Sequence, residues 1–377
     1  MEPLFPSDIE DALLVGRIQT AAGPSPVLVR KGRLFDLSGD VATVADLLAG
    51  PEGELPAGRD MGPVADRDWT PRWQGGKPFL LAPIDLQCIK AAGVTFAVSA
   101  LERVIEERAR GDAAKAFEFR DMIRDRVGSE LSSVRPGSTE AEALKALLIA
   151  EGLWSQYLEV AIGPYAEVFT KAPILSAVGW GEQVGIRPDS HWNNPEPEIV
   201  VVCDPTGRIR GVTLGNDVNL RDMEGRSALL LGKAKDNNAS CALGPFIRLF
   251  DGGFTLDQVR QTKVELEIAG TDNYRLEGAS SMGLISRDPT DLVAQTMGAN
   301  HQYPDGMVLF LGTMFAPVED RDTPGGGFTH KVGDVVRISA TGLGSLVNQV
   351  VLCEDAPPWT FGVSALMRNL AGRGLLN

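Results

Sequence analysis

The alternation of apolar and polar residues predicts a mainly β fold for the larger, C-terminal part of the chain. In residues 263–269, Val264, Leu266 and Ile268 alternate with charged residues, which is typical of a strand that buries one face. Residues 270–273 then supply turn formers before a second short strand at 274–276. Similar short apolar runs, bounded by turn-forming residues, predict further strands over residues 198–203, 209–214, 307–311 and 335–339.

The first part of the chain has a different pattern. Residues 1–80 alternate short apolar runs with glycine and proline and end in the loose stretch 51–77, which predicts a small N-terminal α/β domain and a linker. Residues 99–126 carry apolar side chains at helical spacing among dense charges, and these are Leu101, Val104, Ile105, Phe117, Phe119, Met122 and Ile123. The predicted fold class is α+β, mainly β, with a small domain over residues 1–80 and a larger one over 81–377.

Composition changes the picture by excluding several kinds of partner. The chain has 377 residues and a net charge of -14, from 36 Lys+Arg against 50 Asp+Glu, which repels phosphate backbones and anionic headgroups. Its apolar runs all fall short of the ~20 residues that span a bilayer, and its first residues lack the layout of a signal peptide. We therefore expect a cytoplasmic protein that binds neither nucleic acid nor membranes.

Cysteine and histidine usage restricts the metal chemistry. The four cysteines form no CxxC pair, which argues against zinc ribbons and dithiol redox chemistry and favours free thiols. With only three histidines, a histidine-rich zinc site is excluded by number. The glycine spacings fit neither a P-loop nor a dinucleotide fingerprint, and no G-x-S-x-G elbow is present. Any metal ion should therefore be held mostly by oxygen ligands.

Two glutamates at the start of the strand over 198–203 are the first candidate ligands. Glu196 and Glu198 are two positions apart, so a strand places both carboxylates on one face. Like charges at that distance repel, and a hard cation with oxygen ligands would offset them. Pro197 cannot donate to a sheet ladder, which indicates a strand start or an edge strand. The alternative interpretation is a solvated acidic turn.

A second polar cluster follows the strand over 209–214. It contains Asn216, Asp217, Arg221 and Asp222, at a strand end where binding groups are common. Asp217 could complete a three-carboxylate Mg²⁺ site with Glu196 and Glu198. Alternatively, Asn216 or Asp217 caps a helix that follows.

Together these segments resemble the fumarylacetoacetate hydrolase superfamily, whose signature is E-x-E on a strand followed by N-D-x-x-x-R-D. The similarity continues through Lys233, the run 243–246, the step 311–313 and residues 332–336, and it covers roughly residues 80–355 in consistent order. Several linked motifs are far more specific than any one of them.

The resemblance implies a β-roll catalytic domain behind a small N-terminal domain, in a homodimer or larger homo-oligomer. It also implies Mg²⁺, with Mn²⁺ an open alternative, bound by Glu196, Glu198 and Asp217. A 2-oxo acid would chelate that ion, which then acts as a Lewis acid. By the same match, the residues expected to line the pocket for the 2-oxo acid are Arg221, Lys233, Gly312 and Thr313.

One departure from the family pattern is informative. Where hydrolytic and decarboxylating members carry a histidine base, this chain has Ser99, while the glutamate three residues later is kept as Glu102. A serine hydroxyl cannot efficiently deprotonate water near neutral pH. This change, with the segments 190–194 and 301–306, makes the chain resemble the sugar-acid dehydratase branch, whose reaction converts a 2-keto-3-deoxypentonate to 2,5-dioxopentanoate.

We therefore expect Mg²⁺-dependent dehydration of 2-keto-3-deoxy-D-xylonate in oxidative pentose catabolism, with the C4 configuration of the substrate left open. In this hypothesis Glu102 is the base for the C3 proton, Ser99 positions the leaving hydroxyl, and Lys233 stabilises developing negative charge. Each residue also has a structural interpretation: Glu102 on a solvated helix face, Ser99 as a helix cap, and Lys233 as a surface lysine.

Two other functions stay open at this point. The first is an acylpyruvate-type C–C bond hydrolase in which His191 takes over the role of the missing base. The second is a non-catalytic sugar-acid-binding protein that retains the chelating carboxylates. A pure binding protein needs neither Glu102 nor Lys233, which weighs against the second alternative.

Overall fold

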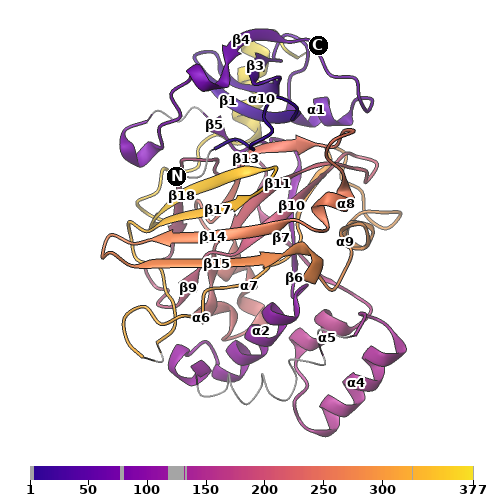
Figure 1. Cartoon of the computed structure of the whole chain (residues 1–377), viewed down its shortest axis with the longest axis vertical. Helices are drawn as coiled ribbons and strands as arrows, with labels where there is room; N and C mark the ends of the chain where they lie inside the picture. Colours follow the sequence, from indigo (N-terminus) through magenta and orange to yellow (C-terminus); the bar gives the residue numbers. More distant parts are fainter. Residues whose placement is uncertain (1–3, 77–79, 118–130, 132–133, 325, 377) are drawn as a thin grey trace.

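The computed structural model describes residues 4–76, 80–117, 131, 134–324 and 326–376. Figure 1 shows three regions along the long axis: the N-terminal strands with α10 at one end, crossing strands in the middle, and α2, α4 and α5 at the other end. Strands dominate the middle region, which confirms the prediction of an α+β, mainly β fold.

An eleven-stranded sheet runs through the molecule in the order β4-β3-β2-β1-β13-β11-β10-β16-β6-β7, with β5 paired to β1. Its strands are β1 (Leu14–Thr20), β2 (Gly23–Arg30), β3 (Arg33–Asp36), β4 (Arg59–Pro63), β5 (Leu80–Leu81), β6 (Cys88–Gly93), β7 (Glu167–Ala172), β10 (Pro197–Cys203), β11 (Ile209–Asp217), β13 (Cys241–Leu249) and β16 (Met307–Phe310). The central strand β10 lies between β11 and β16, so Pro197 marks a strand start and not an edge.

A five-stranded sheet with the order β15-β14-β17-β18-β8 packs against the large sheet. Its strands are β8 (Gln183–Ile186), β14 (Lys263–Ala269), β15 (Arg275–Ser281), β17 (Val335–Ala340) and β18 (Gly344–Leu352). The alternating residues Val264, Leu266 and Ile268 enter one core with Val201 and Leu214 of the large sheet. The predicted half-buried strand and its hairpin are therefore confirmed.

Helices and one short ladder complete the fold. The helices are α1 (Val44–Ala49), α2 (Ala97–Ala109), α4 (Thr139–Ala150), α5 (Gln156–Ile162), α6 (Arg221–Glu224), α7 (Leu231–Lys235), α8 (Leu256–Val259), α9 (Pro289–Thr296) and α10 (Val363–Gly372), and the ladder pairs β9 (Asn193–Asn194) with β12 (Asn219–Leu220). Helix α2 realises the first half of the predicted helical segment. Phe119, Met122 and Ile123 of that prediction lie outside the described residues.

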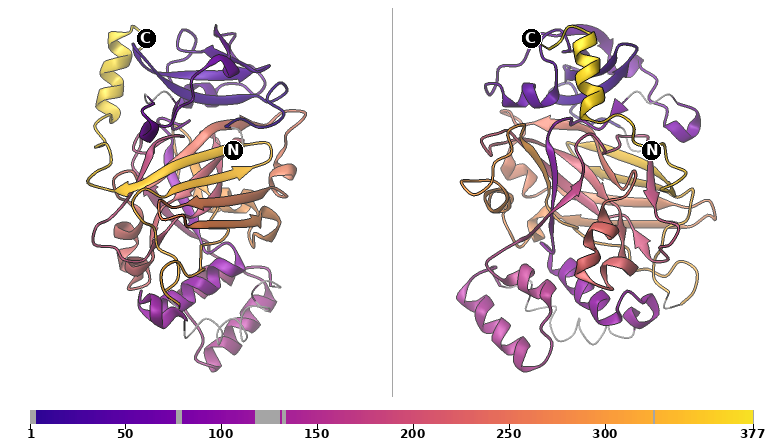
Figure 2. Two further views of the ribbon diagram at one scale, coloured as in Figure 1. Left: turned by 60° about the vertical axis from the view of Figure 1, so that its left-hand side comes forward. Right: turned by 180° about the vertical axis from the view of Figure 1, so that it is seen from behind.

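The N-terminal strands are hydrogen-bonded directly to the central sheet. Strand β1 pairs with β13 through Leu14↔Arg248 and Val15↔Ile247. Helix α10 returns to the same end of the molecule (Figure 2), where the Asn369 side chain donates to the carbonyl of Ala22 at 2.8 Å. The division into domains at residue 80 stays a prediction.

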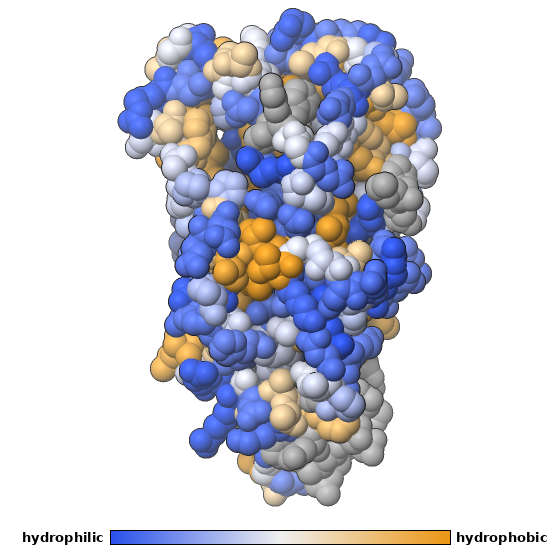
Figure 3. All heavy atoms as spheres, turned by 90° about the vertical axis from the view of Figure 1, so that its left-hand side faces the viewer, coloured by the Kyte–Doolittle hydropathy of each residue, from blue (hydrophilic) through white to orange (hydrophobic). Residues whose placement is uncertain are grey.

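The surface is mostly hydrophilic. On the face drawn in Figure 3, a compact hydrophobic patch lies near the middle among polar residues. Patches of this kind often mark contacts with other proteins, but the expected homo-oligomer stays a prediction. No helix in the described part of the chain combines the length and apolar composition that crossing a bilayer requires.

Asp85 ties the N-terminal helix to the rest of the chain. Its buried carboxylate accepts hydrogen bonds from the backbone N–H groups of Val44 at 2.7 Å and Ala45 at 3.0 Å, at the start of α1. It also lies 3.8 Å from the guanidinium of Arg17. Asp85 therefore satisfies unpaired amides at a helix N-terminus, where negative charge is favoured.

We expect Asp85→Ala to lower the free energy of unfolding by about 2–4 kcal/mol, because it leaves two buried amide donors without their acceptor and removes the negative charge beside the buried Arg17 guanidinium. Asp60→Ala, which removes an exposed ion pair with Arg33, should cost less than about 1 kcal/mol. Urea denaturation followed by circular dichroism measures both. Equal losses in the two variants would contradict the assigned role of Asp85.

Candidate active site

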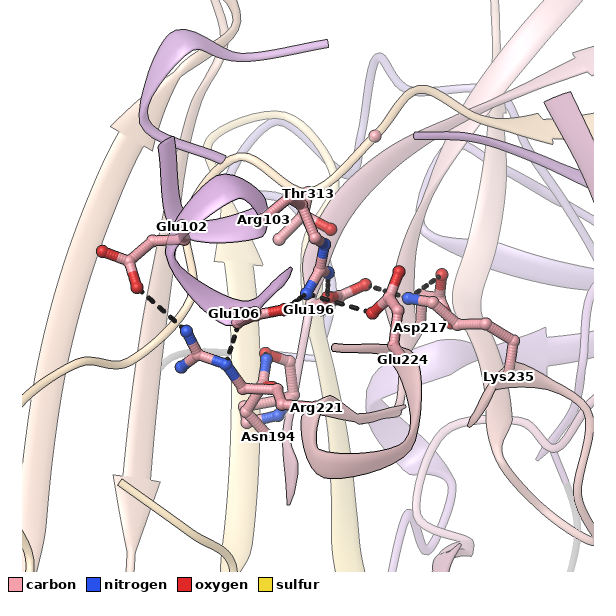
Figure 4. Close-up of polar contacts among 12 residues, drawn as sticks. Glu102, Arg103, Glu106, Asn194, Glu196, Asp217, Arg221, Glu224, Lys235 and Thr313 are labelled. Carbon is pink, nitrogen blue, oxygen red and sulfur yellow. Dashed lines mark hydrogen bonds and ion pairs between the residues drawn. The ribbon is translucent and has the colours of Figure 1, made fainter. Parts of the chain in front are cut away.

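The antiparallel pairing of β10 with β11 brings three carboxylates together. Pro197 pairs with Asn216 and Glu198 with Gly215, so Glu196 and Asp217 meet at the open end of the hairpin. One carboxylate oxygen from each of Glu196, Glu198 and Asp217 lies within 4.8 Å of the others. The predicted ligand set therefore forms one cluster. Figure 4 labels two of its members, Glu196 and Asp217, with the neighbouring cations Arg103 and Lys235.

Burial excludes the structural alternatives for these residues. Glu196 and Glu198 are 0% and 1% exposed, so they do not form a solvated acidic turn. Asp217 ends β11, and the following helix α6 begins at Arg221 with Leu220 as its N-cap, so Asp217 is not a helix cap. Three buried carboxylates that lie together are a suitable ligand set for a hard divalent cation.

The predicted turn at residues 311–313 supports Glu198. The backbone N–H of Gly312 donates to Glu198 Oε2 at 2.7 Å, and the Thr313 hydroxyl lies 3.4 Å from Glu198 Oε1. Gly312 has a φ of 104°, and a Cβ there would lie 2.0 Å from the Thr95 hydroxyl. Only glycine fits this position, which aims a backbone donor at the carboxylate.

Lys235 provides the main positive charge beside the carboxylates. Its buried ammonium contacts Glu196 Oε2 and lies 3.0 Å from Asp217 Oδ2. Lys171, also buried, pairs with Asp217 Oδ1 at 2.7 Å. Although burial opposes its charge, the Asp217 and Glu196 carboxylates raise the pKa of Lys235 above its usual value, so it stays cationic.

The predicted pocket lysine, Lys233, lies elsewhere. Its side chain is 45% exposed and pairs with Asp189 at 3.3 Å. A helix turns by about 100° per residue, so positions two apart on α7 point to nearly opposite sides. Lys235 therefore occupies the place that we expected for Lys233.

The carboxylates differ in their titration. Burial and the neighbouring charges of Asp217 and Glu196 raise the pKa of Glu198 well above its usual range. Burial acts in the same direction on Glu196, but Lys235 and Arg103 outweigh it and lower its pKa to about 2. The neighbouring cations thus keep Glu196 charged, whereas burial and the adjacent carboxylates disfavour the charged form of Glu198.

Helix α2 sends Ser99 and Arg103 into the site. Both are 6% exposed and line the cavity above the carboxylates. The Arg103 guanidinium contacts Glu196 Oε1 and lies 3.0 Å from Glu224 Oε2 of α6. Helix α2 begins at Ala97 with Phe96 as its N-cap, so the interpretation of Ser99 as a helix cap is wrong.

Glu102 and Arg221 form a neighbouring cluster. Arg221 is fully buried and pairs with Glu102 at 2.9 Å and with Glu106 at 2.7 Å, and its Nη1 donates to the carbonyl of Pro317. Its guanidinium also lies over the Trp192 ring, 4.4 Å from the centroid. Glu102 is 7% exposed and does not lie on a solvated helix face. The structure places neither residue in the cavity lining.

Glu167 faces the carboxylate cluster from β7. It pairs across the sheet with Gly93 of β6, and a Cβ at Gly93 would lie 1.9 Å from Glu167 Oε2. A glycine is therefore needed for the Glu167 side chain to cross β6. Burial, with a smaller contribution from the Glu224 carboxylate, raises the pKa of Glu167 to about 7.

These side chains surround one small cavity. Its lining comes mainly from α2, from β6 and β7 and from both strands of the hairpin that carries the carboxylates. The lining residues are Ala92, Gly93, Val94, Ser99, Arg103, Glu167, Phe169, Glu196, Glu198, Asp217, Glu224, Lys235 and Thr313. His191 is exposed and is not in this lining. The interpretation of His191 as a migrated base therefore has no geometric support.

Sequence reasoning missed four residues of the site: Arg103, Glu167, Glu224 and Lys235. Arg103 is four positions after Ser99, so helical spacing would have placed the two on one face. Lys235 competes with Lys233 only two residues away, and helix phase separates them. We found no signal in the sequence that distinguishes Glu167 or Glu224 from the other acidic residues.

Comparison with known proteins identifies relatives. The family model described as fumarylacetoacetate (FAA) hydrolase C-terminal matches residues 162–351, just over half of the chain. The 2-dehydro-3-deoxy-D-arabinonate dehydratase of Saccharolobus solfataricus is 32% identical over 187 residues, covering 49% of this chain and 58% of the relative. The probable 2-keto-3-deoxyxylonate dehydratase of Haloferax volcanii is 30% identical over 194 residues, covering 52% of this chain and 63% of the relative. Each alignment thus spans less than two thirds of the relative.

Solved structures share the fold. A hexagonal crystal form of 2-keto-3-deoxyarabinonate dehydratase matches with a TM-score of 0.62 and 22% identity, covering 89% of this chain and 98% of that one. A 2-keto-3-deoxy-D-arabinonate dehydratase complexed with magnesium and 2,5-dioxopentanoate matches with a TM-score of 0.60, 22% identity and the same coverage. At these identities the match establishes the fold alone.

The two lysines of α7 provide a matched test of the site. We expect Lys235→Met to lower the free energy of unfolding of the metal-free protein by about 3–5 kcal/mol, because it leaves buried carboxylates without their counter-ion. Lys233→Met should cost less than about 1 kcal/mol, because its partner Asp189 is half exposed. Urea denaturation in the presence of a chelator measures both. A larger loss in Lys233→Met would reverse the assignment.

Proposed function

Because the chain belongs to the fumarylacetoacetate hydrolase family, we propose that it is a hydro-lyase that uses a divalent cation to dehydrate a 2-keto-3-deoxy sugar acid. The observation that carries this proposal is the cavity in which three buried carboxylates, the cation Lys235 and a glutamate with a pKa near neutrality face one another. Both curated relatives bear the names of sugar-acid dehydratases, which supports the reaction class.

The residues present fit a divalent cation. Oxygen ligands come from Glu196, Glu198 and Asp217 on one hairpin. Burial and their mutual repulsion raise the pKa of Glu198, and a bound cation would offset that repulsion. Mg²⁺ is the ion we propose, since one structural neighbour is a complex with magnesium, and Mn²⁺ can use the same ligands. Once bound, the ion would supply Lewis acidity toward the carboxylate and keto oxygen of a 2-oxo acid.

Glu167 replaces Glu102 as our candidate base. Glu102 is held by Arg221 outside the cavity, whereas Glu167 lines the cavity across from the carboxylate cluster. A carboxyl group with a pKa of about 7 can accept the C3 proton near neutral pH and then return it to the departing C4 hydroxyl, which leaves as water. The same environment that raises its pKa therefore suits both roles.

The remaining cavity residues would orient the substrate. Lys235 stays cationic and would stabilise the negative charge that develops when the C3 proton leaves. Ser99 lies on the α2 side of the cavity, and we propose that its hydroxyl positions the leaving C4 hydroxyl. Thr313 remains a candidate for contact with the 2-oxo acid end, while Arg221 supports α2 from outside the cavity.

As substrate we propose 2-keto-3-deoxy-D-xylonate, with 2,5-dioxopentanoate as product. Loss of the C3 proton and the C4 hydroxyl gives an unsaturated 2-oxo acid. A proton shift from C5 to C3 then gives the C4–C5 enol, and transfer of the enol hydroxyl proton to C4 yields the aldehyde. In a 2-keto-3-deoxypentonate C4 is the only stereocentre, and the D-arabinonate and D-xylonate derivatives share its configuration. The L-arabinonate derivative has the opposite C4 configuration and is therefore tested beside the D-xylonate one. A cytoplasmic location and a homo-oligomer complete the proposal.

Incubation with each 2-keto-3-deoxypentonate and Mg²⁺ should give a product lighter by one water that reacts as an aldehyde. A chelator should abolish the reaction, and added Mg²⁺ should restore it, because the carboxylate triad loses its cation. Mass spectrometry and an aldehyde reagent follow the product. Unchanged sugar acid together with cleavage of an acylpyruvate would favour the C–C bond hydrolase, and bound but unchanged sugar acid would favour a binding protein.

Glu167→Gln should lower kcat by about 10²-fold or more, the usual contribution of a general base. In the unaltered protein, kcat/KM should fall as the pH drops below about 7, because Glu167 must be ionised to accept a proton. The charged groups that set this pKa are Glu224, Arg103, Lys235 and Glu196.

Glu102→Gln provides the comparison, since it alters the rival base and should keep the acidic limb of the pH profile. Metal affinity, measured by calorimetry, shows whether either variant has damaged the carboxylate site. If Glu102→Gln loses the acidic limb and Glu167→Gln keeps it, then Glu102 is the base.

A further inference from the structure

Arg103 is the one guanidinium in the described lining of the cavity, and it contacts a predicted metal ligand. Its Nη2 donates to Glu196 Oε1, while Lys235 holds Glu196 Oε2 (Figure 4). Both oxygens of Glu196 are therefore occupied by cationic donors. Glu198, in contrast, is held by the neutral donors Gly312 and Thr313.

This arrangement opposes metal binding at Glu196. A divalent ion needs a lone pair on at least one carboxylate oxygen. A guanidinium at the same oxygen takes one of its two lone pairs and repels the incoming charge. Because the site is buried, solvent screens this repulsion weakly. The positive charge that stabilises the metal-free cluster thus competes with the ion that the cluster would bind.

Arg103 has other acceptors to which it can remain bound. Its Nη1 lies 2.6 Å from Glu106 Oε2 and 3.0 Å from Glu224 Oε2. Glu106 is itself fixed from its other oxygen by Arg221 at 2.7 Å. If Arg103 leaves Glu196, it keeps two buried carboxylates, so its charge does not become unpaired.

We propose that Arg103 is the counter-cation of the metal-free site. It competes with the divalent ion for Glu196, and when the ion binds it leaves Glu196 and keeps its contacts with Glu106 and Glu224. The inference rests on the proposed metal site. It makes the ion bind weakly to the empty protein, and a 2-oxo acid that adds ligands to the ion then strengthens its binding. Loading of ion and substrate is therefore coupled through Glu196.

The test compares metal binding by the full-length, metal-free protein and its Arg103→Gln variant, with Mn²⁺ as the probe in calorimetry and electron paramagnetic resonance. Arg103→Gln should bind Mn²⁺ at least about fivefold more tightly, the lower end of typical coupling between sites. It should also have a lower Tm without metal and a larger metal-induced rise in Tm, because the empty cluster has lost a counter-ion.

Arg226→Gln is the matched control, since it removes the same charge from an exposed position after α6. It should bind Mn²⁺ like the unaltered protein. If Arg103→Gln does not fold, Arg103→Lys tests the same point. Lysine lacks the planar fork by which Nη2 of Arg103 reaches Glu196 while Nη1 contacts Glu106 and Glu224, so this variant should also bind Mn²⁺ more tightly than the unaltered protein.

The outcomes separate this inference from the proposed function. If the unaltered protein binds Mn²⁺ and the folded Arg103 variants bind it equally or more weakly, Arg103 does not compete with the ion and the inference is overturned. If neither the unaltered protein nor any variant binds Mn²⁺, the proposed metal site falls, and the inference falls with it.

Discussion

The pairing of buried carboxylates with buried cations is the interaction on which the rest of the site depends. Glu196, Glu198 and Asp217 meet because β10 and β11 are adjacent central strands, and burial makes their mutual repulsion costly. Lys235 of α7 and Arg103 of α2 offset that repulsion, and both helices lie outside the hairpin. The same contacts that balance the charge therefore also fix the positions of both helices over the sheet.

Close backbone approach provides the second constraint. Gly312 directs its N–H at Glu198 with a backbone conformation and a clearance from Thr95 that a side chain would not allow. Gly93 performs the corresponding role for Glu167, whose carboxyl group lies where a Cβ of residue 93 would be. Gly312, in the loop after β16, and Gly93, at the end of β6, thus help to place Glu198 and Glu167, although neither glycine carries a functional group.

The strands and the shared face of Glu196 and Glu198 could be predicted from the sequence because both are local patterns. Period-two alternation gave the bounds of β14, and the spacing of Glu196 and Glu198 indicated a shared face before any fold was known. The second layer of the site depends on helix phase and on contacts between distant segments. Lys233 and Lys235 are equivalent in composition, and only the rotation of α7 decides which one is buried. Glu167 acquires its raised pKa from burial and from the Glu224 carboxylate on α6, against the opposing charges of Arg103 on α2 and Lys235 on α7, and no local pattern reveals these contacts.

Helix α2 presents two adjacent faces to the site, one that lines the cavity and one that holds Arg221. Ser99 and Arg103 are one turn apart and face the cavity, while Glu102 and Glu106 are one turn apart on the adjacent face and hold Arg221. Glu102 therefore lies outside the cavity that Ser99 lines, and its ion pair with Arg221 supports the helix. In the proposed reaction, proton transfer comes from another element, and the candidate is Glu167 of β7, which lines the same cavity. In this arrangement the helix contributes charge and a hydroxyl, and the sheet contributes the titrating group.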